Sequence, residues 1–297
     1  MRGGTVSVGE NHLILSFVGN RGRSASGSVR ITRANARFPQ WRALLSYRAM
    51  RQRAGQFVVQ AVRPISLVVE FGWPVRALIG HAERPLSNWA EQMLQTAGGE
   101  RVAVAPGLLG ELGGKDEDTP ELVVASPGDA ELSRIQVGPS FLCAVFDQPS
   151  NPANIWTMAR SLDAFGGGGL IVTGHTADPY DPRSVRALPG SLLTLPLVRS
   201  PSRQVLAWAE RLRAQRQPPT VVGTDENGTC DVAEPGLTNL TLLVIGDETN
   251  GLSAGWRQAC GTITRIPMAC SASSLNVASA ATVVSYEAAR ERRGPTA

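Results

Sequence analysis

Short apolar runs alternate with amphipathic segments along the second half of the chain. The runs 141–147, 170–174 and 242–246 are almost continuously apolar, which is typical of strands in a parallel sheet covered on both faces. Segment 204–215 repeats apolar residues at helical spacing, and 275–293 favours a long helix. This alternation predicts an α/β domain with a mostly parallel sheet. The pattern adds strands at 220–224 and 263–268 and a helix at 152–165.

The first half carries a similar alternation of shorter elements. Residues 34–55 predict a helix, because Phe38, Trp41, Leu44 and Leu45 fall at helical spacing. Strands and helices then alternate up to residue 126, which predicts a small α/β sandwich. The expected strands are 56–61, 75–80, 101–105 and 121–126, and the expected helices are 63–72 and 86–96.

The chain length of 297 residues suits two domains. The polar stretch 127–140, with two prolines and two glycines, is the expected linker between a first domain, 29–126, and a second, 141–297. Residues 1–28 are expected to form a flexible basic leader without a signal-peptide pattern. No run of about 18 apolar residues occurs, so no membrane-spanning helix is expected.

Charge is distributed unevenly along the chain. Residues 1–63 contain eleven arginines and one acidic residue, Glu10, for a local net charge of +10, whereas the remainder carries −6. A basic block of this kind is expected where a protein binds phosphate groups. The alternative is a solvated, partly disordered basic tail.

The cysteine and histidine pattern gives no sign of a metal site. The four cysteines are Cys143, Cys230, Cys260 and Cys270. None forms a C-x-x-C pair, and the three histidines are scattered, so no zinc site is expected. Free thiols indicate a reducing, cytoplasmic setting.

The first of three polar segments follows the strand that ends at residue 147. Asn151 and Pro152 predict a helix start, with a side-chain cap and then proline in the first turn. Asn154 and Arg160 both reach the strand ends if the first turn is irregular. Taken alone, the segment is also explained as helix capping.

The second polar segment, 246–252, follows the strand 242–246. Gly246 and Gly251 permit close approach of the backbone to a ligand, and Glu248 between them can accept hydrogen bonds from hydroxyl groups. A tight turn between a strand and a helix gives a similar pattern.

The third polar segment, 266–277, leads into the last helix. Pro267 cannot donate to a central sheet ladder, so the chain leaves the sheet here. Ser274 and Asn276 stand at the helix start, where such side chains cap free amides. An ordinary capped loop is the alternative.

Taken together and in this order, the three segments resemble the signature of the SpoU (TrmH-type) branch of the SPOUT RNA methyltransferases. The resemblance covers residues 141–293. The segment 31–63 is similar to the family's substrate-binding domain, an L30e-like RNA-binding fold, although Gln60 and Ala61 stand where Glu and Gly are commoner. The whole pattern is most similar to the avilamycin-type (orthosomycin) resistance enzymes, which methylate a ribose of 23S rRNA.

The resemblance implies an S-adenosylmethionine-dependent ribose 2′-O-methyltransferase. It also implies a deep trefoil knot in the C-terminal domain and a homodimer whose sites are built from both copies. The catalytic side would comprise Arg160, Asn154, Glu248, Ser274 and Asn276. The cofactor pocket would comprise Thr224, Gly246, Ile266, Met268 and Leu275. The basic block supplies the expected RNA contacts, Arg37, Arg42, Arg51, Arg53 and Arg63.

Methyl transfer is an in-line displacement at a carbon that the sulfonium charge already activates. The enzyme therefore chiefly positions the donor and the hydroxyl. We do not expect Arg160 to act as a base, because guanidinium stays protonated in proteins. Stabilising the developing alkoxide, or holding a neighbouring phosphate, suits this side chain better.

Trp156 is the main departure from the family pattern, because these enzymes usually have glycine there. Its indole could stack on an RNA base, pack into the dimer core, or obstruct the site. The leading hypothesis is a 23S rRNA enzyme that confers antibiotic resistance. A tRNA ribose methyltransferase and a catalytically silent RNA-binding protein are the alternatives. The L30e-like domain argues against the tRNA enzyme, since the smallest tRNA enzymes of this branch lack one.

Overall fold

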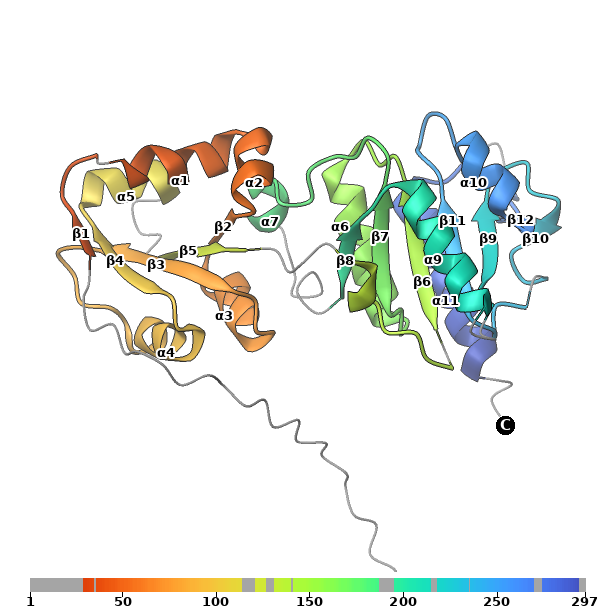
Figure 1. Cartoon of the computed structure of the whole chain (residues 1–297), viewed down its shortest axis with the longest axis horizontal. Coiled ribbons are helices and arrows are strands. Elements are labelled where there is room, and N and C mark those ends of the chain that lie inside the picture. Colours follow the sequence, from red (N-terminus) through yellow and green to blue (C-terminus); the bar gives the residue numbers. More distant parts are fainter. Residues whose placement is uncertain are drawn as a thin grey trace, which may run out of the picture.

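A computed structural model shows two α/β units that follow one another along the chain (Figure 1). The structure describes residues 29–34, 36–113, 121–126, 131–139, 141–186, 195–214, 218–234, 236–269 and 274–293. The expected leader 1–28, the ends of the expected linker and Cys270 lie outside the described residues. No helix of the described part is long and apolar enough to cross a membrane.

The first unit is a mixed five-stranded sheet in the order β1-β4-β3-β5-β2. Strands β1, β4 and β3 pair in parallel, and β5 is antiparallel to both β3 and β2. The strands are β1 (Val29–Ile31), β2 (Phe57–Gln60), β3 (Val75–His81), β4 (Glu100–Val104) and β5 (Glu121–Ala125). The helices are α1 (Arg37–Ser46), α2 (Arg48–Ala54), α3 (Val62–Glu70), α4 (Asn88–Ala97) and α5 (Pro106–Gly113).

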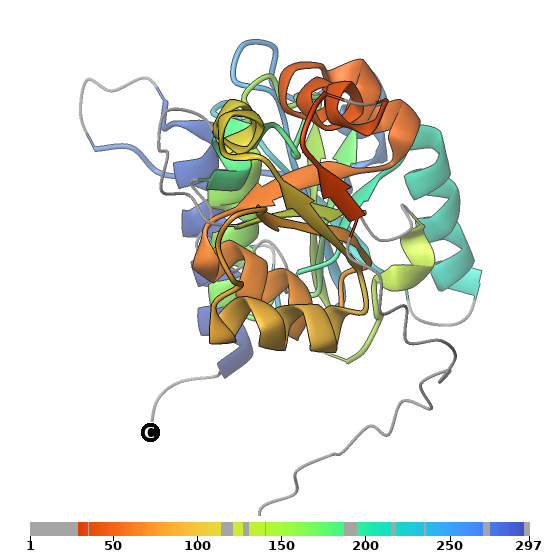
Figure 2. The ribbon, with the colours of Figure 1, turned by 90° about the vertical axis from the view of Figure 1, so that its left-hand side faces the viewer.

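Helices cover both faces of this sheet, as the expected sandwich requires (Figures 1 and 2). Side chains alternate along β2, so Val58 packs with the α1 and α5 side, whereas Phe57 and Val59 pack with the α3 side. The expected single helix 34–55 is wrong, because Tyr47 is extended (φ −122°, ψ 117°) and divides it into α1 and α2. Strand β1 and helix α5 were not predicted.

The second unit is a seven-stranded sheet, parallel throughout, in the order β10-β12-β9-β11-β6-β7-β8. The predicted α/β class and the mostly parallel sheet are confirmed. The strands are β6 (Leu142–Asp147), β7 (Gly169–Thr173), β8 (Leu197–Arg199), β9 (Thr220–Thr224), β10 (Cys230–Asp231), β11 (Thr241–Ile245) and β12 (Thr262–Arg265). The helices are α6 (Pro152–Ala164), α7 (Pro182–Arg186), α9 (Ser202–Ala214), α10 (Ala254–Ala259) and α11 (Val277–Arg293).

Two buried clusters hold this sheet between helices. One joins the α6 and α11 side to Ala144 and Phe146 of β6, and the other joins the α9 and α10 side to Cys143 and Val145 of the same strand. Part of the expected linker belongs to this core, since Ile135 is buried in the second cluster. The continuous apolar runs of the sequence therefore reflect burial on both faces.

The two units are packed against one another through the segment after β7. Arg51 of α2 is 6% exposed and donates from Nε to Oδ2 of Asp178 at 2.6 Å and from Nη1 to the carbonyl oxygen of Leu44 at 2.6 Å. Tyr180 packs on Phe57, with ring centroids 4.6 Å apart. The expectation that Arg51 contacts RNA is wrong, because its guanidinium is buried and satisfied within the protein.

Candidate active site

A cavity of about 880 Å³ opens at the carboxyl ends of β9, β11 and β12, beside the start of α11. The three loops that leave these strands form most of its wall. All five residues predicted to bind a cofactor line it, namely Thr224, Gly246, Ile266, Met268 and Leu275. Parallel strands place their carboxyl ends at one sheet edge, which explains why segments far apart in sequence meet here.

The wall at the β11 exit is a tight turn between Gly246 and Gly251. Asp247 and Gly251 exchange two backbone hydrogen bonds, of 3.1 and 3.0 Å. A Cβ on Gly246 would lie 2.1 Å from the carbonyl carbon of Gly251, and Gly251 has φ +64°. Neither position accepts a side chain without movement of the backbone. The segment is therefore a tight turn, as one interpretation of the sequence predicted, and the same turn lines the cavity.

Glu248 joins the three motifs at the mouth of the cavity. Its Oε1 accepts from Nδ2 of Asn154 at 2.6 Å and from Nδ2 of Asn276 at 2.8 Å. Ser274 lines the same cavity. Four of the five predicted catalytic residues thus lie together, although they come from α6, from the turn after β11 and from the segment that precedes α11.

Local capping fixes the start of α6 and holds the side chain of Asn276. Asn151 accepts from the backbone N–H of Ala153 at 2.9 Å, as the sequence predicts for the start of α6. The Oδ1 of Asn276 accepts from the backbone N–H of Ala278 at 3.0 Å, which leaves its amide nitrogen facing Glu248. One side chain therefore caps α11 and contributes to the site.

Arg160 is the predicted catalytic residue that the structure does not bring to this cavity. It is exposed on α6, six residues beyond Asn154, or about 9 Å along the helix axis. It does not line the cavity formed by the described residues of the chain. In a single copy, Arg160 is therefore not part of the cavity wall to which Glu248 belongs.

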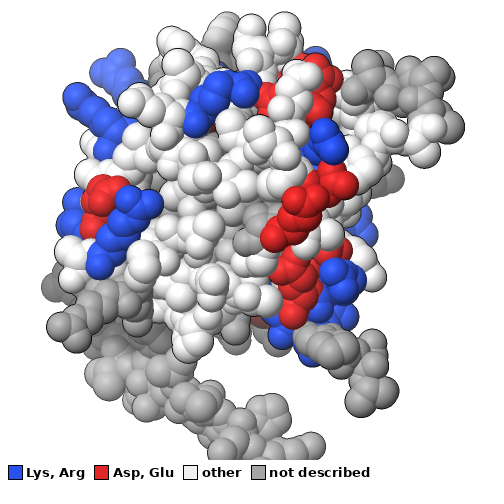
Figure 3. Space-filling model, turned by 90° about the vertical axis from the view of Figure 1, so that its right-hand side faces the viewer, with Lys and Arg blue, Asp and Glu red and all other residues white. Residues whose placement is uncertain are grey.

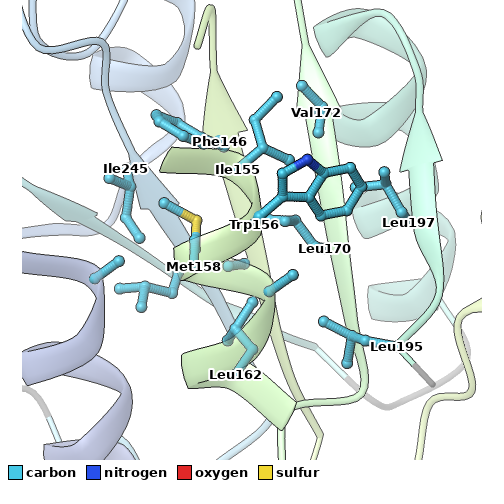
Figure 4. Close-up of a cluster of buried hydrophobic side chains, with 14 of the residues drawn as sticks. Phe146, Ile155, Trp156, Met158, Leu162, Leu170, Val172, Leu195, Leu197 and Ile245 are labelled. Atoms are coloured by element: carbon cyan, nitrogen blue, oxygen red, sulfur yellow. The ribbon is translucent and has the colours of Figure 1, made fainter. Parts of the chain in front are cut away.

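Trp156 faces away from the cavity and into the core. Its indole is 8% exposed and points toward Leu170, Val172 and Leu197 of β7 and β8 (Figure 4). Its Nε1 has no hydrogen-bond partner among the residues that the structure describes. The ring is buried in the chain's own core rather than in a dimer core, and this burial contradicts both base stacking and obstruction of the site, because the ring is not accessible from the cavity.

The cavity wall carries an excess of acidic side chains. Two arginines of the wall are paired with acids, Arg257 with Asp225 and Arg265 with Asp231. Three further carboxylates line the cavity, namely Glu226, Asp247 and Glu248. Figure 3 looks onto the β10 end of the sheet, where acidic side chains gather in a band. A wall of this charge favours a cationic ligand.

Asp225 is the best-anchored of these acids, and sequence reasoning missed it. Burial raises its pKa, but hydrogen bonds from the backbone N–H of Asn227 and from Arg257 outweigh burial and hold the pKa below its ordinary value. The carboxylate therefore stays charged. The signal was available, because Asp225 directly follows the predicted strand 220–224, as each of the three motifs follows a strand.

The remaining predicted RNA contacts lie on the first unit. Arg37 pairs with Glu100 at 2.7 Å and Arg42 with Glu111 at 3.5 Å, while Arg53 and Arg63 are exposed. Among the described residues, no group of three or more His, Cys, Asp or Glu is arranged to hold a metal ion.

Comparison with known proteins gives consistent matches over both units. Residues 35–124 match the family model of the SpoU L30e-like domain, and residues 142–286 match that of the SpoU rRNA methylase family. The 23S rRNA (uridine(2479)-2′-O)-methyltransferase of Streptomyces viridochromogenes is 53% identical over 276 residues, which cover 92% of this chain and 96% of the relative.

Solved structures show the same arrangement. The SpoU methyltransferase AviRb from Streptomyces viridochromogenes, in complex with the cofactor AdoMet, has a TM-score of 0.82 at 52% identity and covers 89% of this chain and 100% of that one. An AdoMet-bound rRNA methyltransferase from Sinorhizobium meliloti shares the fold, with a TM-score of 0.76 at 24% identity over 90% of this chain and 98% of that one.

Proposed function

Because this chain belongs to the SpoU rRNA methylase family, as its motifs predicted, we propose that it methylates a ribose 2′-hydroxyl of 23S rRNA with S-adenosylmethionine as donor. The observation that carries the proposal is the meeting of Asn154, Glu248 and Asn276 at the mouth of the cavity. The similarity to a 23S rRNA enzyme over 92% of the chain supports the choice of substrate.

The cavity fits the donor by size and by charge. Pockets for ligands of this size measure about 300–1,000 Å³, and the acidic wall complements a sulfonium cation. When bound, S-adenosylmethionine supplies a methyl group that its positive charge already activates. The chain's own task is to bind and orient. The turn at Gly246 and the segments at Ile266 and Leu275 would hold the donor.

Glu248 is held ready to accept a hydrogen bond from a substrate hydroxyl. Two amide donors fix its Oε1, and its Oε2 accepts no hydrogen bond from the described residues. Glu248→Gln removes the charge at nearly constant shape. We expect this variant to bind the donor and to lose most of its methyl transfer.

Arg160 would act from a second copy of the chain. We propose a homodimer in which α6 of one copy brings Arg160 to the cavity of the other, where it stabilises the developing alkoxide or holds a phosphate. Exposed apolar side chains beside the cavity and on α11 support such an interface: Met268, Leu275, Val283 and Tyr286. The deep trefoil knot of the family also stays a prediction for this chain.

Mixing two inactive variants tests the dimer. If Arg160 acts across the interface, Arg160→Ala and Glu248→Gln proteins exchanged into mixed dimers regain one complete site per mixed dimer, or about a quarter of wild-type activity. If Arg160 acts within its own chain, mixing restores nothing. An Arg160→Ala enzyme with normal RNA binding and full turnover would exclude both roles of this residue.

The activity itself is tested by incubating unmodified 23S rRNA with the protein and labelled S-adenosylmethionine, followed by mapping of ribose methylation. We expect label at a single nucleotide and none with Glu248→Gln. Methylation of tRNA alone would favour the tRNA alternative, and donor binding without transfer to any RNA would favour a silent RNA-binding protein.

We further propose that the modification acts in the cytoplasm and confers resistance to an orthosomycin-type antibiotic. Resistance is measured as a raised inhibitory concentration of the antibiotic in a host that expresses the protein.

A further inference from the structure

Two arginines from different units converge on one side chain at the junction between them. With the Gln52 amide turned so that its oxygen faces donors, that oxygen accepts from Nε of Arg48 at 2.8 Å and from Nη1 of Arg199 at 2.8 Å. Arg48 and Gln52 lie four residues apart on α2, so they share one helix face, and Arg199 is the last residue of β8. We call Arg48 and Arg199 the junction arginines.

Neither junction arginine has a carboxylate partner in the described part of the chain. The ion pairs found among the described residues include neither of them. Two guanidinium groups therefore share one neutral acceptor, an arrangement that costs repulsion unless an anion lies between them. Arg199 is exposed and Arg48 is half-buried, so an anion can reach the pair. Arginine offers the fork of donors that suits a phosphate.

The position of the pair is fixed by the packed interface described above. Arg51, on the same helix, is buried and ion-paired with Asp178 of the second unit, which holds α2 against that unit. Helices α1 and α2 lie along the same edge of the molecule as the carboxyl ends of the parallel strands, in both views (Figures 1 and 2). Helix α2, which carries Arg48 and Gln52, therefore lies along the same edge of the protein as the strand ends that form the cavity.

We propose that the junction arginines bind a backbone phosphate of the substrate RNA. The inference rests on the proposed function and identifies a part of the protein surface that would bind the substrate RNA. The acidic cavity wall repels phosphate, so the affinity for RNA must come from another part of the surface. A phosphate bound across the junction engages both units at once, which orients the RNA while one ribose lies at the cavity.

Gln52→Glu gives the sharpest test. A carboxylate at this position pairs with both junction arginines, so the variant should be as stable as wild type or more stable, and should nevertheless bind RNA more weakly. A merely structural role for the three residues predicts no loss of RNA affinity. Arg48→Gln and Arg199→Gln should each also weaken binding. Arg211→Gln, which removes an exposed arginine near the far end of α9, is the matched control.

Binding is measured with unmodified 23S rRNA and with poly(U) over a range of salt concentrations. Each junction variant should lower the slope of log affinity against log salt by about 0.7–0.9, and Arg211→Gln should not. S-adenosylmethionine affinity, measured by calorimetry, should stay at the wild-type value in all four variants. Wild-type RNA affinity and salt slope in Gln52→Glu and in both arginine variants would overturn the inference. Failure to methylate 23S rRNA would instead overturn the proposed function, because the poly(U) measurement is independent of it.

Discussion

Ala61 occupies a backbone conformation that only glycine adopts readily, and replacing it should stabilise the protein. It precedes α3 with φ 75° and ψ 151°. In this region a Cβ clashes with the neighbouring backbone, and such residues cost about 1–3 kcal/mol.

The net gain from Ala61→Gly follows from two opposing effects. Glycine removes the strain but raises the entropy of the unfolded chain by about 0.4–1 kcal/mol. Ala61 is exposed, so the lost methyl group contributes little burial. We therefore expect a stabilisation of about 0.5–2 kcal/mol. One kcal/mol corresponds to an increase in Tm of about 2–4 °C for a protein of this size.

Urea unfolding followed by circular dichroism measures this difference through the shift in midpoint at constant slope. Ala207→Gly supplies the matched control, because Ala207 is exposed in the middle of α9, where the same change should cost about 1 kcal/mol. Opposite signs for the two variants are expected. If Ala61→Gly destabilises the protein as Ala207→Gly does, the strain argument is refuted.

Three further substitutions test the site, the core and the interface. Gly246→Ala should lower S-adenosylmethionine affinity at least tenfold in calorimetry, because the added Cβ would lie 2.1 Å from the backbone of Gly251. Gly110→Ala is the control and should leave the affinity unchanged, because there is open space around Gly110. Equal affinities of the two variants would contradict the role of the turn. Trp156→Gly should lower the free energy of unfolding by about 3–5 kcal/mol, measured in urea. Trp156→Phe should lower it much less, since Nε1 has no hydrogen-bond partner among the described residues. Raised activity of the glycine variant at unchanged stability would restore the obstruction interpretation. Arg51→Met should cost about 3–5 kcal/mol, because it leaves a buried carboxylate unpaired, and a loss below 1 kcal/mol would show that water reaches the junction.

The parallel sheet and the three motifs could be predicted because their signals are local. The strand 220–224 has the same bounds in sequence and structure, since an apolar run buried on both faces is recognisable by itself. The places where prediction failed depend on tertiary contacts. Nothing around Arg51 in the sequence distinguishes it from its exposed neighbours, because its partner Asp178 lies 127 residues away. The break at Tyr47 likewise occurs within a continuous helical pattern.

The site residues divide in the same way. Strand exits located Glu248 and Asn276, whereas the direction in which Trp156 points depends on how α6 lies on the sheet. Arg160 was placed correctly on α6, but its distance from the cavity could be seen only once the helix was in position. The types of residue that form the site could thus be predicted from the sequence, whereas the positions of these residues relative to one another could not.

The central strand of the second sheet has a consequence for synthesis of the protein. Strand β11 pairs with β6, although about a hundred residues separate them, and the cavity is closed only by the segment that leads into α11. The first unit can fold while the ribosome is still translating, but the second sheet is incomplete until β12 has been made. A nascent copy that lacks the segment before α11 therefore has an incomplete donor pocket, and we expect it to bind S-adenosylmethionine only once that segment has been made.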